Sequence, residues 1–180
     1  MRYQFHVTID PPKNASHNMT TDLALLDRAA HEKGVFLRFY GWTPPAISLG
    51  CMQEPSTLLD LDALESAGLD YVKRPTGGRA ILHWNDLTYA IAFPVNAPGL
   101  GGSIQERYAA ISRCLMAGLS RAGIACGAHD SAAEYAATKR EIKLPCFLSP
   151  TRNEIMVNGK KLLGSAQKRT DRAVLQHGSI

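Results

Sequence analysis

The sequence predicts an α+β fold in which helices flank a mixed β-sheet. Two segments repeat apolar residues at the three- and four-residue spacing of an amphipathic helix, and a glycine follows each of them. Several shorter segments have the apolar character of strands. Helices and strands follow one another without regular βαβ alternation, so we expect strands of both orientations in the sheet.

Glycines and prolines divide the first half of the chain into predicted elements. The first helix has Met19, Leu23, Leu26 and Ala30 on one face and stops at Gly34. The predicted helices of this half are 18–33 and 58–67, and the predicted strands are 35–40, 46–49 and 69–73.

The second half begins with the glycine-rich turn RPTGGR and two β-like segments, 80–83 and 87–93. The Trp84-Asn85-Asp86 link between these segments predicts a hairpin, and the Asn158-Gly159 pair predicts another. The remaining predicted elements are a helix over 104–122, strands near Ile124 and over 154–157, 161–164 and 173–177, and a loop or small helix over 129–143.

Length and composition indicate one globular domain over residues 1–180. Of the 180 residues, 45% are hydrophobic and 20% are charged. No apolar stretch approaches the length that spans a bilayer, and MRYQFHVTID has neither the apolar region nor the cleavage site of a signal peptide. We therefore expect a cytoplasmic protein with no membrane partner.

Charge and cysteine usage exclude further classes. The net charge is +4, and the basic residues are scattered rather than gathered into the patch of a nucleic-acid-binding protein. The four cysteines include no CxxC pair and no zinc-like Cys/His spacing, so we expect reduced thiols and no metal site. Cys114 is predicted to be buried in a helix, and Cys51 and Cys126 are interpreted as packing residues.

The segment RPTGGRAILH, residues 74–83, is the first candidate for chemistry. Gly77 and Gly78 follow a predicted strand, so the backbone there can approach a ligand and direct amides at it. Arg74 and Arg79 flank the turn with charge suited to phosphate or carboxylate. A plain β-turn flanked by arginines explains the same residues. No P-loop lysine or dinucleotide-binding fingerprint is present.

Two further segments carry possible catalytic groups. Lys161 stands on a predicted strand shortly before Gly164, Ser165 and Ala166, where its ammonium could hold a carbonyl or phosphate oxygen. An exposed strand lysine is the alternative. Cys146, in LPCFLSP, is framed by apolar residues and prolines, which usually means an inert thiol. It becomes a nucleophile only where positive charge stabilises its thiolate; the candidate neighbours are Lys161, His83 and Arg74.

Several segments, in order, resemble the catalytic domain of the lipoate-protein ligases and octanoyltransferases. These segments are NMTTDLALLDRA, FYGWTPPAISLGCMQ, VKRPTGGRAILHWNDLTYAI, MVNGKKLLGSAQKR and AVLQHGSI. The similarity runs from about Asn18 to the last residue, and together the motifs are specific. The chain is identified as a member of this superfamily, which also contains the biotin ligases.

The resemblance implies a mixed sheet of the biotin/lipoate protein ligase type, lined by a tunnel for an octanoyl or lipoyl chain. Arg74 and the turn Thr76-Gly77-Gly78 would form one wall, and His83 would make a polar contact. Lys161 matches the family's active-site lysine, which lies against the acyl carbonyl. Trp42, Ser48, Leu49 and Gly50 fall in the segment that supports the pocket.

Two chemistries share this scaffold. The ligases activate a free acid with ATP and magnesium, whereas the octanoyltransferases take octanoate from acyl carrier protein through a cysteine thioester and need no cofactor. The turn reads TGGR where ligases typically have TGGG, and the segment around Cys146 resembles the cysteine loop of ligase-like octanoyltransferases. Cys146 would attack the thioester and Lys161 would stabilise the oxyanion. The transferase is the favoured interpretation.

The acceptor implied by the resemblance is a lysine of a lipoyl-domain protein, either a glycine cleavage H protein or a dehydrogenase E2 subunit. An amidotransferase acting between two lipoyl-domain proteins would also use a cysteine. The family's domain normally continues past AVLQHGSI, so the domain is apparently shortened at its C-terminus, and a non-catalytic lipoyl-domain-binding fragment stays open. Lys73-Arg74 replaces the frequent pair of arginines, and TGGR does not match the GRGRxG-like turn of biotin ligases. His83 and His177 are candidates for the general base.

Overall fold

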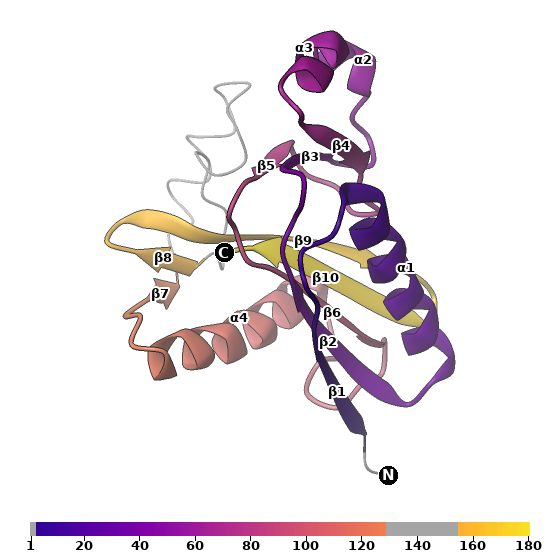
Figure 1. Ribbon diagram of the computed structural model, residues 1–180. Helices are drawn as coiled ribbons and strands as arrows, with labels where there is room; N and C mark the ends of the chain where they lie inside the picture. The colour runs from indigo at the N-terminus through magenta and orange to yellow at the C-terminus, as the bar shows by residue number, and fades with distance from the viewer. Residues whose placement is uncertain (1–2, 129–154) are drawn as a thin grey trace.

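The computed structural model describes residues 3–128 and 155–180 and has the predicted α+β architecture. A seven-stranded sheet carries α1 on one face and α4 on the other, and a three-stranded sheet with α2 and α3 stands at one end (Figure 1). The elements are β1 (Gln4–Ile9), α1 (Ala15–His31), β2 (Gly34–Tyr40), β3 (Ala46–Leu49), α2 (Pro55–Leu58), α3 (Leu61–Ser66), β4 (Asp70–Lys73), β5 (Ile81–His83), β6 (Thr88–Pro94), α4 (Ile104–Arg121), β7 (Gly127–Ala128), β8 (Ile155–Val157), β9 (Lys160–Arg169) and β10 (Ala173–Ser179).

The large sheet has the order β1-β2-β6-β10-β9-β8-β7, and the small sheet has the order β4-β3-β5. β1 runs parallel to β2 and β3 runs parallel to β4, while the other pairs are antiparallel. The prediction of a mixed sheet is therefore confirmed.

The two faces of the large sheet build two cores through the alternation of side chains along each strand. Phe36, Tyr40, Ala90, Ala92 and Leu175 pack against α1. Their neighbours along the strands face α4, and this second set comprises Val35, Tyr89, Phe93, Ile155, Leu163 and Val174 together with Ile111 of the helix. β6 and β10 are covered on both faces, which explains their nearly continuous apolar sequence.

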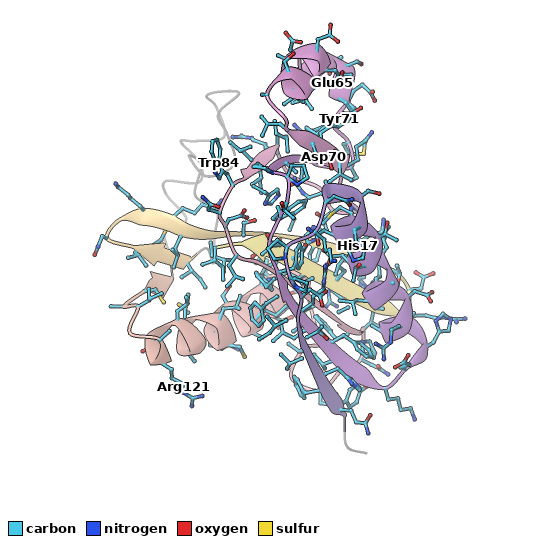
Figure 2. All side chains as sticks on the ribbon, viewed as in Figure 1. His17, Glu65, Asp70, Tyr71, Trp84 and Arg121 are labelled. Carbon is cyan, nitrogen blue, oxygen red and sulfur yellow. The ribbon has the colours of Figure 1, made fainter. Side chains whose placement is uncertain are left out.

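The predicted hairpin at Trp84-Asn85-Asp86 is wrong. β5 pairs with β3 in the small sheet, whereas β6 lies between β2 and β10 and has no edge left for β5. The link therefore crosses from one sheet to the other, with Asn85 in the left-handed region at φ 56°. Trp84 lies at the outer side of this crossing and is 65% exposed (Figure 2).

The other differences are smaller. The helix predicted over 58–67 is shorter and spans Leu61–Ser66, because Leu59 is extended and the Asp60 carboxylate caps the helix at the Ala63 amide; α2 was not predicted. The short strand predicted near Ile124 forms slightly later, as β7, and β1 was not predicted. Cys114 is exposed rather than buried, and Cys51, interpreted as a packing residue, is exposed too. The hairpin at Asn158-Gly159 is confirmed, with positive φ at both residues as its tight turn requires. The predicted loop or helix over 129–143 lies outside the described residues.

A buried ion pair ties α1 to the large sheet. Arg38 on β2 is 1% exposed and donates from Nη1 to Asp22 Oδ1 at 2.9 Å and from Nε to Asp10 Oδ2 at 2.6 Å. Its Nη2 donates to Asn18 Oδ1 at 2.9 Å, and Tyr40 Oη donates to Asp22 Oδ2 at 2.8 Å. At the start of α1, the Ala15 amide also bonds to Asp70 Oδ2 of the small sheet at 3.3 Å (Figure 2).

Replacing Arg38 with Met should destabilise the fold by about 3–5 kcal/mol, because Asp22 is left as an uncompensated charge in the core. Urea denaturation measures this loss of unfolding free energy. The control is Glu32→Gln, which breaks the surface pair Arg28–Glu32 and should change stability little. Equal effects of the two substitutions would contradict the central role of the buried pair.

Candidate active site

A pocket lies where the small sheet meets the α1 face of the large sheet. About 430 Å³ of space between atoms lies at this position, part of it open solvent at the mouth of the pocket. The glycine turn and β5 form one wall, and β9 and β10 form the other. The lining residues are Met19, Tyr40, Trp42, Ser48, Arg74, Gly78, Ile81, His83, Thr88, Gly164, Ser165, Ala166, His177, Gly178 and Ser179.

Arg74 organises the glycine turn from within. The residue is 4% exposed, and each nitrogen of its guanidinium donates to an oxygen of this chain. Nη1 reaches Ser48 O at 2.8 Å, Nη2 reaches Gly77 O at 2.9 Å and Arg79 O at 2.7 Å, and Nε reaches Gly77 O at 3.3 Å. The arginine that the sequence suggested for an anionic ligand thus binds the backbone of the turn.

Two glycines allow backbones to approach closely around the pocket. A Cβ at Gly50 would lie 2.1 Å from Gly78 O, so the end of β3 can meet the turn only without a side chain. A Cβ at Gly178 would lie 2.4 Å from Gly164 O, where β10 and β9 form the opposite wall.

His83 is held between a hydroxyl and a carboxylate. Its Nε2 lies 2.8 Å from Ser48 Oγ, and its Nδ1 lies 2.8 Å from Asp86 Oδ2. Ser48 Oγ accepts from Arg74 Nη1 at 3.2 Å, so its own proton is available to His83 Nε2. The ring of Trp42 stacks on that of His83 with centroids 3.9 Å apart.

Burial lowers the pKa of His83 and outweighs the opposing effect of the Asp86 carboxylate. Burial on its own would raise the pKa of Asp86, but its hydrogen bond with His83 contributes to a net lowering. The pair at neutral pH is therefore an Asp86 carboxylate beside a neutral imidazole that donates from Nδ1.

His177 on β10 has the same kind of partners. Its Nδ1 lies 2.8 Å from Asp22 Oδ2, and its Nε2 lies 2.7 Å from Thr76 Oγ1 in the glycine turn. His177 is 5% exposed and Thr76 is 1% exposed. A hydrogen-bonded chain therefore runs from α1 through β10 to the turn.

Ser165 is fixed from the α4 side of the sheet. Its Oγ lies 2.7 Å from Tyr89 Oη, and its carbonyl accepts from Tyr108 Oη at 3.0 Å. Burial raises the pKa of Tyr89 to about 12, against the effect of its hydrogen bonds with Gln176 and Ser165, so its hydroxyl keeps its proton.

The structure gathers part of the predicted site. Arg74, Gly78, His83, Gly164, Ser165 and Ala166 line the pocket, whereas Thr76, Gly77, Arg79 and Lys161 do not. Lys161 lies half-buried on β9, three residues before Gly164. Cys146 lies outside the described residues, so its place relative to the pocket stays a prediction.

Asp22 and Asp86, the carboxylates that bond to the two histidines, were not predicted from the sequence, and neither were the lining residues Tyr40, Ile81, Thr88, Gly178 and Ser179. Asp22 stands between Met19 and Leu26 on the apolar face of α1, and a carboxylate on a buried face requires a polar partner. That position on the apolar face was the sequence signal for a buried role of Asp22. No such signal marks Asp86, because aspartate is equally common in the hairpin turn that was predicted there.

Among residues 3–128 and 155–180, no group of three or more His, Cys, Asp or Glu side chains is arranged to hold a metal ion. No helix in the same residues is long and apolar enough to cross a membrane.

A mixed sheet whose glycine turn faces a Gly-Ser-Ala strand segment across a pocket is the arrangement expected from the motifs of a protein-ligase catalytic domain. The family described as the lipoyl protein ligase A/B catalytic domain matches residues 14–180, and the chain belongs to this family.

Among curated proteins, the chain is similar to proteins named octanoyltransferase LipM. It is 40% identical to that of Kyrpidia tusciae over 173 residues and 40% identical to that of Carboxydothermus hydrogenoformans over 168 residues. These matches cover 93% of this chain but only 62% and 61% of the relatives, so the chain spans about three fifths of their length.

Solved structures support the fold. A putative lipoate protein ligase from T. acidophilum with bound lipoic acid superposes with a TM-score of 0.75 at 20% identity, covering 100% of this chain and 68% of that one. A lipoate-protein ligase A bound with ATP superposes with a TM-score of 0.76 at 20% identity, and this match covers 100% of this chain and 66% of that one.

Gly50→Ala should destabilise the protein by about 1–3 kcal/mol, because the new methyl group meets the Gly78 carbonyl and forces the turn away from β3. Thermal or urea unfolding measures the loss. Gly77→Ala is the matched control, since a Cβ there meets nothing within 4 Å. A larger loss for Gly77→Ala than for Gly50→Ala would show that the close approach is unimportant.

The lowered pKa of His83 should make stability depend on pH. The unfolded imidazole titrates near 6.5, so as the pH falls through that value the unfolded chain binds the proton before the folded one. The contribution of His83 is thus fully present above pH 6.5 and is lost as the pH falls toward the folded-state pKa.

Urea titrations between neutral pH and about pH 5 test this dependence in the wild type and in His83→Gln. The wild type should lose more stability than the variant over this range. Parallel curves for the two proteins would contradict a lowered pKa.

Proposed function

We propose that this chain carries the catalytic site of an octanoyltransferase. The enzyme would move an octanoyl group from acyl carrier protein, through a thioester on Cys146, to a lysine of a lipoyl-domain protein. The similarity to LipM octanoyltransferases over 93% of the chain supports this activity. We also propose that the enzyme acts in the cytoplasm.

The engagement of Arg74 removes this side chain as a ready ligand for the phosphate of an acyl-adenylate, and the preference for a transferase rests on the similarity to the LipM octanoyltransferases. All three of its nitrogens donate to oxygens of Ser48, Gly77 and Arg79. Holding an adenylate phosphate would require breaking bonds that shape the turn. A thioester donor brings an already activated acyl group, so the site needs neither ATP nor magnesium for it.

The pocket has the chemistry of an acyl site. Met19, Trp42 and Ile81 offer apolar surface to a hydrocarbon chain, and the small residues of β9 let that chain lie against the sheet. The ring nitrogens of His83 and His177 already bond to Ser48, Asp86, Thr76 and Asp22, so a bound hydrocarbon chain would meet mainly apolar surface in this pocket.

The proposed reaction has two acyl transfers. The Cys146 thiolate attacks the octanoyl thioester; a new C–S bond forms, the bond to the carrier sulfur breaks, and the carrier leaves as a thiol after taking a proton. The uncharged amine of the acceptor lysine then attacks the Cys146 thioester. A C–N bond forms, the Cys146 sulfur leaves, and the amine loses a proton.

Lys161 would serve both steps as a fixed positive charge. An ammonium near the carbonyl stabilises the oxyanion of each tetrahedral intermediate, and near the sulfur it favours the thiolate. This role rests on its position in the KKLLGSAQKR segment, close along β9 to the pocket-lining Gly164.

Intact mass spectrometry tests the intermediate. Wild-type chain mixed with octanoyl-acyl carrier protein, without ATP, should gain one octanoyl group that hydroxylamine removes. Cys146→Ala should gain nothing. Cys114→Ala is the matched control, because Cys114 is an exposed thiol on α4, and it should acylate like the wild type.

The same mixtures test the role of Lys161. Lys161→Ala should lower the acylation rate by about 10²-fold or more, as loss of an oxyanion-stabilising group does.

Adding a lipoyl domain to these mixtures distinguishes the transferase from a ligase, an amidotransferase and a binding module. Modification of the domain only with ATP and free octanoate or lipoate would identify a ligase. Transfer only from an octanoylated lipoyl domain would identify an amidotransferase, and binding without any transfer would identify a binding module.

A further inference from the structure

The glycine turn has few anchors of its own. Gly77 and Gly78 carry no side chains, and a Cβ at Gly77 would meet nothing within 4 Å, so no side-chain packing holds the turn at Gly77. Glycine also loses more conformational freedom on folding than any other residue. Hydrogen bonds must therefore fix its position.

Most of these bonds come from nearby segments of the small sheet. Arg74 binds the carbonyls of the turn, and the Cys51 amide donates to Thr76 O at 2.9 Å. Such bonds give the turn its shape. They cannot set its distance from the opposite wall of the pocket, because that wall belongs to the large sheet.

The bond between Thr76 Oγ1 and His177 Nε2 does join the two walls. His177 stands 101 residues from Thr76 in the chain, and on β10 it is the register partner of Ala166, which lines the β9 wall. The 2.7 Å contact therefore fixes the turn relative to the strand segment across the pocket.

The other side of His177 is anchored more firmly. Its Nδ1 faces Asp22 Oδ2 at 2.8 Å, and Asp22 is 0% exposed. Arg38 and Tyr40 donate to the same carboxylate at 2.9 and 2.8 Å. A carboxylate with these partners accepts from Nδ1–H, and in the Nδ1–H tautomer Nε2 accepts the Thr76 hydroxyl proton.

We propose that Asp22, His177 and Thr76 form a positioning chain that sets the distance between the glycine turn and the β9 wall, and that His177 acts in acyl transfer through Thr76 rather than by exchanging protons with the substrate. This proposal rests on the proposed function for its kinetic consequences. Its structural part, the Nδ1–H tautomer bonded to Thr76, stands without that function.

Nitrogen-detected NMR of the wild-type chain tests the structural part. His177 should show a protonated Nδ1 and an unprotonated Nε2, and Thr76→Val should shift the Nε2 signal because that atom loses its only donor among the described partners. A protonated Nε2 in the neutral ring, or no response to Thr76→Val, would overturn the proposal even if the protein transfers no acyl group.

Steady-state kinetics test the functional part. Thr76→Val should lower kcat for octanoyl transfer by about 10²-fold, as small misplacements of reacting groups do, with KM for the carrier donor nearly unchanged. Thr76→Ser keeps the hydroxyl and should retain most of the activity. Thr57→Val is the matched control, since Thr57 is exposed on α2 and its hydroxyl donates to Glu54 O of the neighbouring backbone at 2.9 Å.

A double-mutant cycle shows whether the two residues act as one unit. His177→Asn keeps a donor for Asp22 but no longer reaches Thr76, so the double variant His177→Asn/Thr76→Val should be no slower than the slower single variant. Multiplied losses in kcat, or a Thr76→Val enzyme as active as Thr76→Ser, would overturn the proposal. A wild type that transfers nothing refutes the proposed function. In that case the NMR result alone tests the positioning chain of Asp22, His177 and Thr76.

Discussion

The buried carboxylate of Asp22 is the point at which α1, β2 and β10 are joined. It accepts hydrogen bonds from Arg38, Tyr40 and His177, and each donor comes from the large sheet while the carboxylate comes from the helix. A charge with no exposure to water is tolerated only when its oxygens are occupied in this way. The same partners fix the orientation of His177, so the packing of α1 and the geometry of the pocket depend on one group.

Much of the fold could be predicted because its signals are local. The apolar spacing of the long helices and the Asn158-Gly159 turn each depend on a few neighbouring residues. The error at Trp84-Asn85-Asp86 arose because pairing is not local. Two strands separated by a short link resemble a hairpin, and only the competition of β2 and β10 for both edges of β6 sends β5 to another sheet.

The candidate site was predictable where the sequence motif also supplies the contact. Gly78, His83 and the Gly164–Ala166 segment line the pocket as expected from the motifs. Asp22 and Asp86 were missed because their role depends on distant partners; the Asp22 bond to His177 spans 155 residues. The function expected of Arg74 was a contact with ligand, and no pattern in the sequence indicates that its nitrogens are already occupied by the turn.

The small sheet is an excursion from two neighbouring strands. Tyr40 at the end of β2 and Thr88 at the start of β6 are register partners, so β3, α2, α3, β4 and β5 leave the large sheet and return to it at adjacent positions. The entropy of closing such a loop rises only slowly, by about 0.6 kcal/mol per doubling of its length. The exposed tip formed by α2 and α3 (Figure 1) can therefore lengthen or change its sequence while the register of the large sheet stays the same. Its surface can vary separately from the two walls that enclose the pocket.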